Sequence, residues 1–363
     1  MASLRPRALP LSARTLRSAL SSTRPSPNHF LSAPASTQTR AHSTSSVSAD
    51  ELSHFSALAS SWWDPMGHSR ILHLMNPLRH EFIASCLAEG TSSPSQNPSS
   101  TSTPSTATLN YLDVGCGGGI FAESLARTIP LDPTGPAPTP TLAASMTAID
   151  PSTDLIQMAR EHARMDPTVH EHLRTGRFKY LNTTLEDVLA GNAVTLTPAS
   201  SSTAASTPNP SSPSTQPAPQ YDVVTLFEVL EHIDPKTSTP LSFLTNCLRA
   251  LKPGGWLIGS TISRTLPSFI LNQVIAEAPW PIGVVPRGTH EWSKFVNPGE
   301  VKGWLQEGLM RAADTGVSRG GSAIAEGMRW KCVGAIYIPG IGWKMVPGSE
   351  DWGNYFWAVR KEI

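Results

Sequence analysis

The chain has 363 residues, of which 39% are hydrophobic and 15% charged, and its formal net charge is +0. Residues 1–49 hold six arginines and no Asp or Glu, so the remainder is net acidic, which disfavours nucleic acid as the main partner. The four cysteines include no CxxC pair and indicate neither a disulfide framework nor a zinc–thiolate site. No run approaches the ~18 consecutive apolar residues that span a bilayer.

The N-terminal stretch, MASLRPRALPLSARTLRSALSSTRPSPNHF, is rich in Arg and Ser and lacks a long apolar segment. This composition is typical of a mitochondrial transit peptide rather than a secretory signal. We therefore predict a transit peptide over residues 1–46 and one folded domain over residues 47–363. A disordered basic tail without a targeting role is the alternative.

Three tracts rich in Ser, Thr and Pro interrupt the folded domain, at residues 90–108, 131–145 and 197–220. Such segments bury too little apolar surface to offset the entropy lost on ordering. We expect them to be disordered insertions without a chemical role.

Between these tracts, apolar runs alternate with segments of helical spacing. Strands are predicted over residues 109–114, 146–150, 178–182, 221–227 and 256–262, and helices over 120–129, 153–165 and 240–251. Lys252-Pro253-Gly254-Gly255 is predicted to stop the last helix in a tight turn. Two further strands, 331–338 and 354–361, are expected to form an antiparallel pair. The alternation predicts an α/β fold with a parallel sheet, which binds ligands at the carboxyl ends of its strands.

The segment LDVGCGGG, residues 112–119, follows the first strand and opens a helix. Glycines at 115, 117 and 119 let the backbone turn tightly and approach a ligand. Counted from Gly115, the sixth position is Ile120, so the dinucleotide fingerprint fails; counted from Gly117 it is Ala122, which the looser form permits. An acid just before the loop, in D-x-G-x-G-x-G, is typical of S-adenosylmethionine enzymes. A tight turn without a ligand is the alternative.

The second predicted strand ends in Asp150. An acid at this position typically holds ribose hydroxyls, about 20 residues beyond the glycines. Here Asp150 lies 31 residues beyond Gly119, and the insertion at 131–145 accounts for the excess.

Several motifs together resemble class I S-adenosylmethionine-dependent methyltransferases: LDVGCGGGIFAESLA, AIDPS, YDVVTLFEVLEH and LKPGGWLIGSTISRT. Two more, SSWWDPMGHSRILHLMNPLRHEFI and RGTHEWSKFVNPGEV, resemble the ubiquinone biosynthesis O-methyltransferases of mitochondria and bacteria. The resemblance covers most of residues 50–310. It implies a Rossmann-like sheet of seven mostly parallel strands, with helices on both faces and an antiparallel final strand.

The resemblance also implies an activity and a set of site residues. Methyl groups would pass from S-adenosylmethionine to ring hydroxyls of 3,4-dihydroxy-5-polyprenylbenzoate and demethylubiquinol, within a multi-enzyme ubiquinone biosynthesis complex. Arg79 would meet the methionine carboxylate, which a guanidinium can bind with two parallel N–H groups. Gly115 and Gly117 would line the cofactor, Asp150 would hold its ribose, and Phe227 would lie beside it. Alone, Arg79 would be read as a surface arginine.

The strand at 221–227 is followed by Glu228, Glu231 and His232, which would share one face of a helical turn. Two carboxylates and an imidazole suit a divalent cation, Mg²⁺ above all, and the resemblance supports a metal requirement. A bound cation would lower the pKa of a catechol hydroxyl and orient its oxygen. Local capping or pairing of Glu231 and His232 is the structural alternative.

Residues 266–286 are apolar, interrupted by prolines, and contain Trp280. This segment is predicted to lie in the membrane interface, or to form a lid over the substrate site. Together with the transit peptide it predicts a peripheral protein on the matrix side of the mitochondrial inner membrane. His290 is a possible base, but a packed or capping histidine is an equal reading, so it is not counted as catalytic.

Two other functions remain open at this point. One is a metal-free class I methyltransferase acting on another small aromatic, which activity in EDTA would reveal. The other is a non-catalytic scaffold with the same fold, which the intact glycine loop and Asp150 disfavour. The glycine spacing disfavours hydride-transfer enzymes.

Overall fold

The computed structural model describes residues 46–67, 69–90, 108–134, 139–191, 220–279, 285, 291–313 and 328–361. Contacts divide the chain into two units, Met1–His42 and Ser43–Ile363, and every described residue belongs to the second. The predicted transit peptide therefore lies outside the described residues except for Ser46. So do His290, Trp280 and most of the predicted insertions at 90–108 and 197–220.

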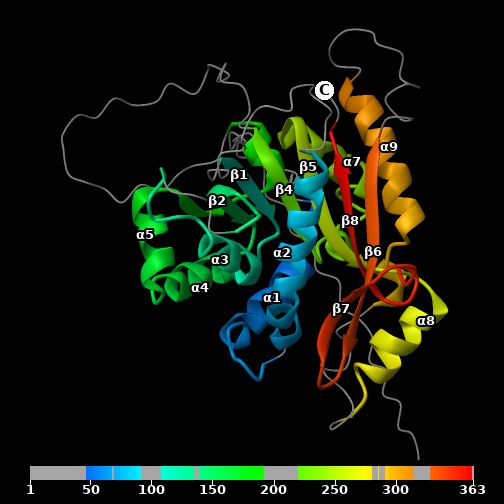
Figure 1. Cartoon of the computed structure of the whole chain (residues 1–363). Coiled ribbons are helices and arrows are strands. Elements are labelled where there is room, and N and C mark those ends of the chain that lie inside the picture. Colours follow the sequence, from blue (N-terminus) through cyan, green and yellow to red (C-terminus); the bar gives the residue numbers. More distant parts are fainter. Residues whose placement is uncertain are drawn as a thin grey trace, which may run out of the picture. The chain divides into compact units, whose positions relative to one another are not determined.

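The described part of the chain contains one sheet of eight strands, in the order β3-β2-β1-β4-β5-β8-β6-β7 (Figure 1). The strands are β1 (Leu109–Val114), β2 (Ala143–Asp150), β3 (Phe178–Asn182), β4 (Tyr221–Phe227), β5 (Leu251–Ile262), β6 (Arg329–Ile338), β7 (Gly342–Val346) and β8 (Asn354–Arg360). The first five strands pair in parallel, and β8 pairs antiparallel with both β5 and β6. The predicted mostly parallel sheet with an antiparallel final strand is confirmed.

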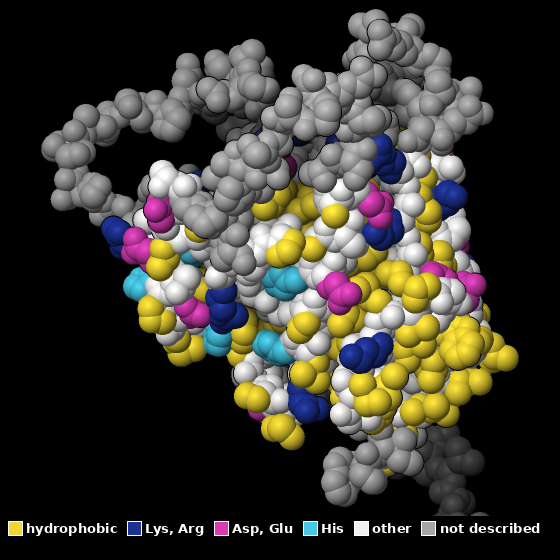
Figure 2. Space-filling view, in the orientation of Figure 1, with side chains coloured by type: hydrophobic (Ala, Val, Ile, Leu, Met, Phe, Trp, Pro, Cys, Tyr) yellow, Lys and Arg dark blue, Asp and Glu magenta, His cyan; other side chains and the backbone are white. Residues whose placement is uncertain are grey.

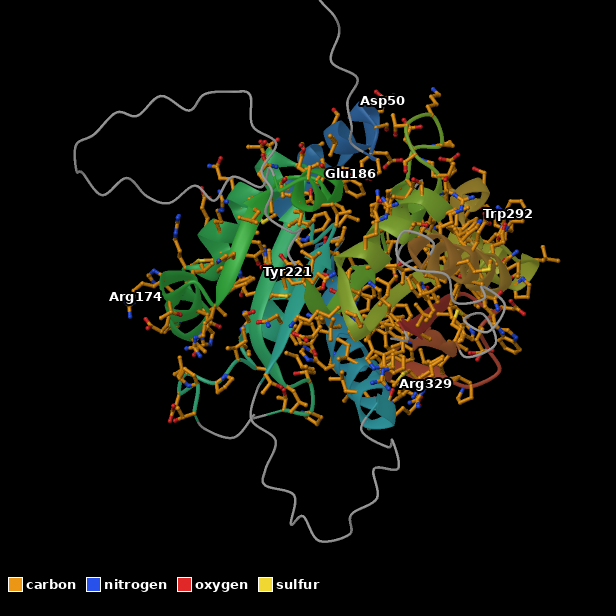
Figure 3. The ribbon with its side chains drawn as sticks, turned by 90° about the horizontal axis from the view of Figure 1, so that it is seen from above. Asp50, Arg174, Glu186, Tyr221, Trp292 and Arg329 are labelled. Carbon is orange, nitrogen blue, oxygen red and sulfur yellow. The ribbon has the colours of Figure 1, made fainter. Side chains whose placement is uncertain are left out.

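Helices cover both faces of this sheet. They are α1 (Ala49–Leu58), α2 (Arg70–Gly90), α3 (Ile120–Ala126), α4 (Thr153–Ala163), α5 (Pro167–Thr175), α6 (Leu185–Leu189), α7 (Pro240–Ala250), α8 (Leu266–Phe269) and α9 (Pro298–Ala313). Successive strand residues point to opposite faces, so Tyr111 joins a core cluster with α2, α3 and α4, while Leu112 joins another with α6, α7 and α9. Viewed from above, Arg174 of α5 and Arg329 of β6 lie toward opposite sides, with Tyr221 of β4 between them (Figure 3).

The strand count differs from the expected seven because of β7. This strand, Gly342–Val346, pairs antiparallel with β6 through a turn at residues 339–341. Its five residues include one glycine and one lysine, too short and mixed a run to signal a strand. The predicted pairing of the segments 331–338 and 354–361 is confirmed by the register of β6 with β8.

Two predicted boundaries are corrected. The sequence predicts a turn at residues 252–255, before the next strand. They belong instead to β5, where the register with β4 shifts between the pairs Tyr221↔Leu251 and Val223↔Trp256. Gly254 there has φ +78°, a conformation that glycine adopts readily. Strand β2 begins at Ala143, so the last three residues of the predicted insertion at 131–145 belong to the sheet.

The apolar segment after β5 is helical over residues 266–275 and continues in turns and bends over 276–279. Its helical part comprises α8 and a π-helix, Ile270–Ile275. None of the helices in the described part of the chain is long and apolar enough to cross a membrane.

Candidate functional site

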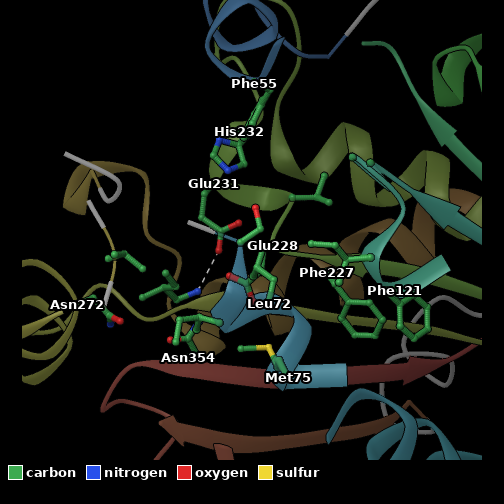
Figure 4. Close-up of a pocket in the computed structure, with 18 of the residues that line it drawn as sticks. Phe55, Leu72, Met75, Phe121, Phe227, Glu228, Glu231, His232, Asn272 and Asn354 are labelled. Carbon is green, nitrogen blue, oxygen red and sulfur yellow. Dashed lines mark hydrogen bonds between the residues drawn. The ribbon is translucent and has the colours of Figure 1, made fainter. Parts of the chain in front are cut away.

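A cavity of about 930 Å³ opens at the carboxyl ends of β1, β2, β4 and β5 (Figure 4). All eight residues predicted for cofactor or metal binding line it: Arg79, Gly115, Gly117, Asp150, Phe227, Glu228, Glu231 and His232. They come from α2 and from the ends of three strands. The first and last of these residues, Arg79 and His232, lie 153 positions apart in the sequence. The parallel topology brings them together at the edge of the sheet where such folds bind ligands.

The glycine loop is built on left-handed backbone. Gly115, Gly117 and Gly119 have φ of +70°, +53° and +85°, a region that other L residues rarely adopt. The N–H groups of Gly115 and Cys116 both donate to the carbonyl oxygen of Ile149, at 2.9 and 3.0 Å, which fixes the loop to β2. A Cβ at Gly115 would lie 2.8 Å from a methyl carbon of Val229, so the loop also needs glycine for space.

Asp150 connects this loop to the start of α4. Its Oδ2 accepts the N–H of Gly117 at 2.9 Å, and its Oδ1 accepts the N–H of Ser152 at 2.8 Å. Burial raises the pKa of the Asp150 carboxyl to about 6, against the opposing effect of these two hydrogen bonds. Each carboxylate oxygen has more than one acceptor site, so the group can still receive hydroxyl donors from a ligand.

Two tryptophans cover the glycine loop on its outer side. A Cβ at Gly117 would lie 2.8 Å from the ring of Trp62, so this ring lies directly against the loop. Trp63 donates its Nε1–H to the carbonyl oxygen of Gly118 at 2.9 Å and stacks on His162, with ring centroids 3.5 Å apart. Both follow α1, so the N-terminal helix and its connection form one wall of the cavity. No spacing or motif in the sequence predicts a contact between these rings and the loop.

Arg79 is buried, with 3% of its surface exposed, and no carboxylate is paired with it in the described structure. One terminal N–H group donates to the Asn76 side chain at 3.0 Å, and the guanidinium carbon lies 4.9 Å from the centre of the Phe227 ring. Its Nε has no hydrogen-bond partner among the described residues. Burial lowers the pKa of Arg79 to about 10, opposed by the charges of Glu228 and Asp113. A buried cation with an unused donor fits an incoming carboxylate.

Asp113, in β1, is a buried acid that lines the cavity, as Asp150 is. Its Oδ1 accepts a hydrogen bond from the Thr225 hydroxyl at 2.6 Å. Burial raises the pKa of Asp113 to about 7, although Thr225 and Arg79 both favour its ionised form. The charge of Arg79 is thus one of the influences that favour the ionised form of Asp113.

Glu228 and Glu231 lie beyond the end of β4. Glu228 has φ +58°, an unusual backbone conformation for a non-glycine residue, and accepts a hydrogen bond from the Ser260 hydroxyl at 2.7 Å. Glu231 accepts from the Thr261 hydroxyl and from the N–H of Ile262, the latter at 3.0 Å. Both bonds use Oε1, and Oε2 is buried without a partner in the described structure. Burial, and then the charge of Glu228, raise the pKa of Glu231.

His232 faces the N-terminal helix rather than the two carboxylates. Its Nδ1 lies 3.1 Å from Oε2 of Glu51, and its ring stacks edge-on against Phe55 with centroids 4.8 Å apart (Figure 4). Lys294 binds the other oxygen of Glu51 at 2.6 Å. The hydrogen bond from His232 is the largest cause of the low pKa of Glu51, about 2.

Comparison with known proteins places the chain in a family. The family described as "Methyltransferase domain" matches residues 70–308. The mitochondrial ubiquinone biosynthesis O-methyltransferase of Candida albicans is 31% identical over 343 residues, covering 87% of this chain and 86% of that protein. The protein of the same name from Schizosaccharomyces pombe is 34% identical over 72% of each chain. The chain belongs to the ubiquinone biosynthesis O-methyltransferase family.

A bacterial relative and a solved structure are also similar to this chain. The ubiquinone biosynthesis O-methyltransferase of Dinoroseobacter shibae is 32% identical over 75% of this chain and 86% of its own length. The crystal structure of magnesium protoporphyrin IX methyltransferase from Synechocystis PCC 6803 covers 86% of this chain, with 13% identity and a TM-score of 0.43. The predicted α/β methyltransferase fold is confirmed by the sheet order and the family match.

The residues present suit the S-adenosylmethionine of this family. The partnerless Nε of Arg79 and the space in front of the glycine loop match a ligand that carries a carboxylate on one side and a ribose on the other. Asp150 stands at the position where ribose hydroxyls are held in this fold. The individual contacts remain predictions.

The predicted metal triad is not assembled as a three-ligand group. Within residues 46–361, so far as they are described, no group of three or more His, Cys, Asp or Glu side chains is placed to hold a metal ion. Glu228 and Glu231 face the same cavity, whereas the Nδ1 of His232 is bound to Glu51. Sequence reasoning missed Glu51, which lies 181 residues from His232 and belongs to no motif.

Proposed function

We propose that this protein is the S-adenosylmethionine-dependent O-methyltransferase of ubiquinone biosynthesis that methylates ring hydroxyls of 3,4-dihydroxy-5-polyprenylbenzoate and of demethylubiquinol. The observation that carries the proposal is the gathering of the glycine loop, Asp150 and the unpaired Arg79 in one cavity. Support comes from relatives of that name at 31–34% identity over most of the chain.

S-Adenosylmethionine, when bound, supplies a methyl group already activated by its sulfonium. The protein mainly has to place the acceptor oxygen in line with that methyl and its sulfur. Arg79 would bind the methionine carboxylate, Asp150 the ribose hydroxyls, and Phe227 would limit how the ligand lies. The acceptor oxygen would form the new O–C bond as the methyl C–S bond breaks, S-adenosylhomocysteine would be the leaving group, and the hydroxyl proton would pass to water.

A divalent metal is a second part of the proposal. A phenolic hydroxyl has a pKa near 10, so it needs help to lose its proton at neutral pH. Glu228 and Glu231 would hold the ion through carboxylate oxygens, including the partnerless Oε2 of Glu231. Mg²⁺ commonly takes one or two carboxylates and keeps several waters, so two protein ligands are enough. The metal would lower the pKa of the hydroxyl. His232 would stay bound to Glu51.

The polyprenyl tail of the substrate would lie in the apolar end of the cavity. Leu271 and Ile275 of the π-helix, with Tyr337 and Trp343 of the β6–β7 hairpin, line this end. Outside it, Leu266 and Ile341 expose 70% and 65% of their surface. Figure 2 shows hydrophobic side chains gathered where Figure 1 places α8. An exposed apolar surface of this kind suits a membrane interface.

This surface supports a location on the matrix side of the inner membrane, bound peripherally, where a polyprenylated substrate resides. Both fungal relatives described above are named as mitochondrial, which supports that compartment. Membership of a multi-enzyme ubiquinone biosynthesis complex is part of the same proposal.

The test is methyl transfer to a short-tailed dihydroxy-polyprenylbenzoate, with and without EDTA, by the wild type and Glu228→Ala. We expect activity that EDTA abolishes, Mg²⁺ restores and the substitution removes. Activity indifferent to EDTA would favour a metal-free methyltransferase and leave Glu228 and Glu231 with structural roles. Binding of S-adenosylmethionine without transfer to any ring hydroxyl would contradict the proposed substrate.

A further inference from the structure

The cavity carries positive charge at two places. Among the described residues that line it, the lysines and arginines are Arg79 and Lys294. Arg79 is deeply buried beside Phe227, where the cofactor is expected. The side chain of Lys294 is 41% exposed and belongs to the short 3₁₀ helix Trp292–Lys294, before α9. Lys294 is therefore the more exposed of the two cations and comes from a different element of the fold.

The backbone of Lys294 is fixed close to the reacting end of the cavity. Two residues later, the N–H of Val296 donates to the carbonyl oxygen of Ile262 at 2.9 Å, at the carboxyl end of β5. The N–H of the same Ile262 donates to Glu231. Phe295, between them, is buried. The segment that carries Lys294 is thus joined to the end of β5 at Ile262, the residue whose N–H binds Glu231, while the Lys294 side chain reaches Glu51 of α1.

Two carboxylates hold the ammonium group of Lys294. Nζ lies 2.6 Å from Oε1 of Glu51 and 2.9 Å from Oε2 of Glu291. An ammonium has three N–H donors, so these partners leave one donor for a further acceptor. Glu51 is itself shared, because its other oxygen binds His232.

The two proposed substrates differ in one charged group, because the polyprenylbenzoate carries a ring carboxylate and demethylubiquinol does not. Seven Asp and Glu residues and two cations line the described cavity, so a carboxylate that enters needs one of those cations or it loses its hydration without compensation. We infer that Lys294 binds the ring carboxylate of the benzoate substrate and that Glu51 competes with this carboxylate for the ammonium group. The inference rests on the proposed function and adds the residue that distinguishes its two substrates.

A purely structural role for the pair predicts something different. If Lys294 and Glu51 only fasten α1 across the cavity, then loss of either partner loosens the same helix. Both substitutions would then harm charged and uncharged substrates alike. If Lys294 binds the substrate carboxylate, loss of Lys294 should weaken binding of the charged substrate and loss of the Glu51 charge should strengthen it. Neither substitution should then change binding of the uncharged substrate.

The experiment compares kcat/KM for a short-tailed dihydroxy-polyprenylbenzoate with kcat/KM for its carboxamide, in which only the charge is removed. The variants are Lys294→Met, Glu51→Gln and Lys302→Met, the last an exposed lysine of α9 outside the cavity lining. Lys294→Met should lower the carboxylate-to-carboxamide ratio roughly tenfold or more, the size of one lost charge-assisted hydrogen bond. Glu51→Gln should raise this ratio, and Lys302→Met should keep the wild-type ratio.

Calorimetric binding of both compounds to the enzyme loaded with S-adenosylhomocysteine gives the same comparison without turnover. The inference would be overturned if Lys294→Met weakened binding of the carboxylate and the carboxamide equally. It would also be overturned if Glu51→Gln lowered the carboxylate-to-carboxamide ratio. If the wild type methylates neither compound, the proposed function fails, while the binding ratio still decides the role of Lys294.

Discussion

The two ends of the cavity differ in how they are built. At the cofactor end, Asp150 is held by two backbone N–H groups, and the glycine loop by the carbonyl oxygen of Ile149. At the substrate end, the π-helix exposes Leu271, Val274 and Ile275, and the hairpin turn exposes Ile341. A charged, polar ligand requires donors and acceptors at fixed places, whereas a long apolar tail requires only apolar area. Single substitutions should therefore be far more damaging at the first end than at the second.

The largest expected effect is that of Gly119→Ala, at the cofactor end. A Cβ there would overlap the hydroxyl of Tyr180 and would lie 2.8 Å from its ring carbon Cζ. Alanine would also have to adopt φ +85°, a backbone conformation that is unfavourable for residues other than glycine. The loop must shift, so we expect S-adenosylhomocysteine binding to be lost in calorimetry while the circular dichroism spectrum stays folded. Gly299→Ala is the matched control, because no atom lies within 4 Å of its added Cβ. Undiminished binding by Gly119→Ala would show that the loop position is not critical.

Arg79→Met should have the next largest effect. The substitution keeps the apolar contact with Phe227 but removes the only buried guanidinium among the described residues of the cavity. Loss of a paired, charge-assisted contact should weaken S-adenosylmethionine binding roughly 100-fold. Equilibrium binding at several salt concentrations is the measurement, with Arg70→Met, exposed on the same helix, for comparison. A change of less than threefold would remove Arg79 from cofactor recognition.

At the substrate end, single contacts should matter less and total area more. The double substitution Leu271→Ser, Ile275→Ser removes several apolar carbons, each worth about 0.8 kcal/mol when buried. We expect KM for a long-tailed substrate to rise about tenfold relative to KM for a short-tailed one. Kinetics with both tails, and with Leu131→Ser as an exposed apolar control, make the comparison. Equal changes for the two tail lengths would mean that the tail lies elsewhere.

The smallest expected effect concerns pH. Burial raises the pKa of Asp113 to about 7, whereas the same group ionises near pH 4 in the unfolded chain. Between these values the folded state holds more protons than the unfolded state, so the free energy of unfolding falls as pH rises through this window. Asp113→Asn should flatten the dependence of Tm on pH between about 4 and 7. Asp154→Asn, an exposed acid on α4, should leave the wild-type slope, and an unchanged slope in Asp113→Asn would contradict the raised pKa.

The sequence predicted the parallel part of the fold almost residue by residue, since β1, β3 and β4 have the expected bounds. The inner strands β1 and β4 are buried over most of their length, so their apolar residues signal them, whereas the edge strand β3 alternates buried Phe178 and Tyr180 with exposed Lys179. Prediction from the sequence failed for segments that are strands only because they pair with a neighbouring strand. Residues 252–255 look like a turn, yet the neighbouring strand keeps them in β5. Strand β7 depends on its partner β6 rather than on its own five residues.

The same division holds for the site. Gly115, Gly117 and Asp150 could be predicted because each conformation or contact requires one residue type. Glu51, Trp62 and Lys294 could not, because their contacts join segments far apart in the chain through side chains that many positions share. The third member of the predicted metal triad illustrates the limit. Spacing placed His232 beside Glu231, but only the fold shows that Glu51 binds it.

Import into mitochondria would bring proteolytic maturation close to the active site. The carbonyl oxygen of Ser46 accepts the N–H of Asp234 at 2.9 Å, and Ser48 caps the helix that carries Glu51. A processing protease that cut directly after Ser46 would remove this carbonyl and leave a charged amino group on Val47, which lines the cavity. If the predicted targeting sequence were removed there, the position of the cut would set the charge at the edge of the cavity.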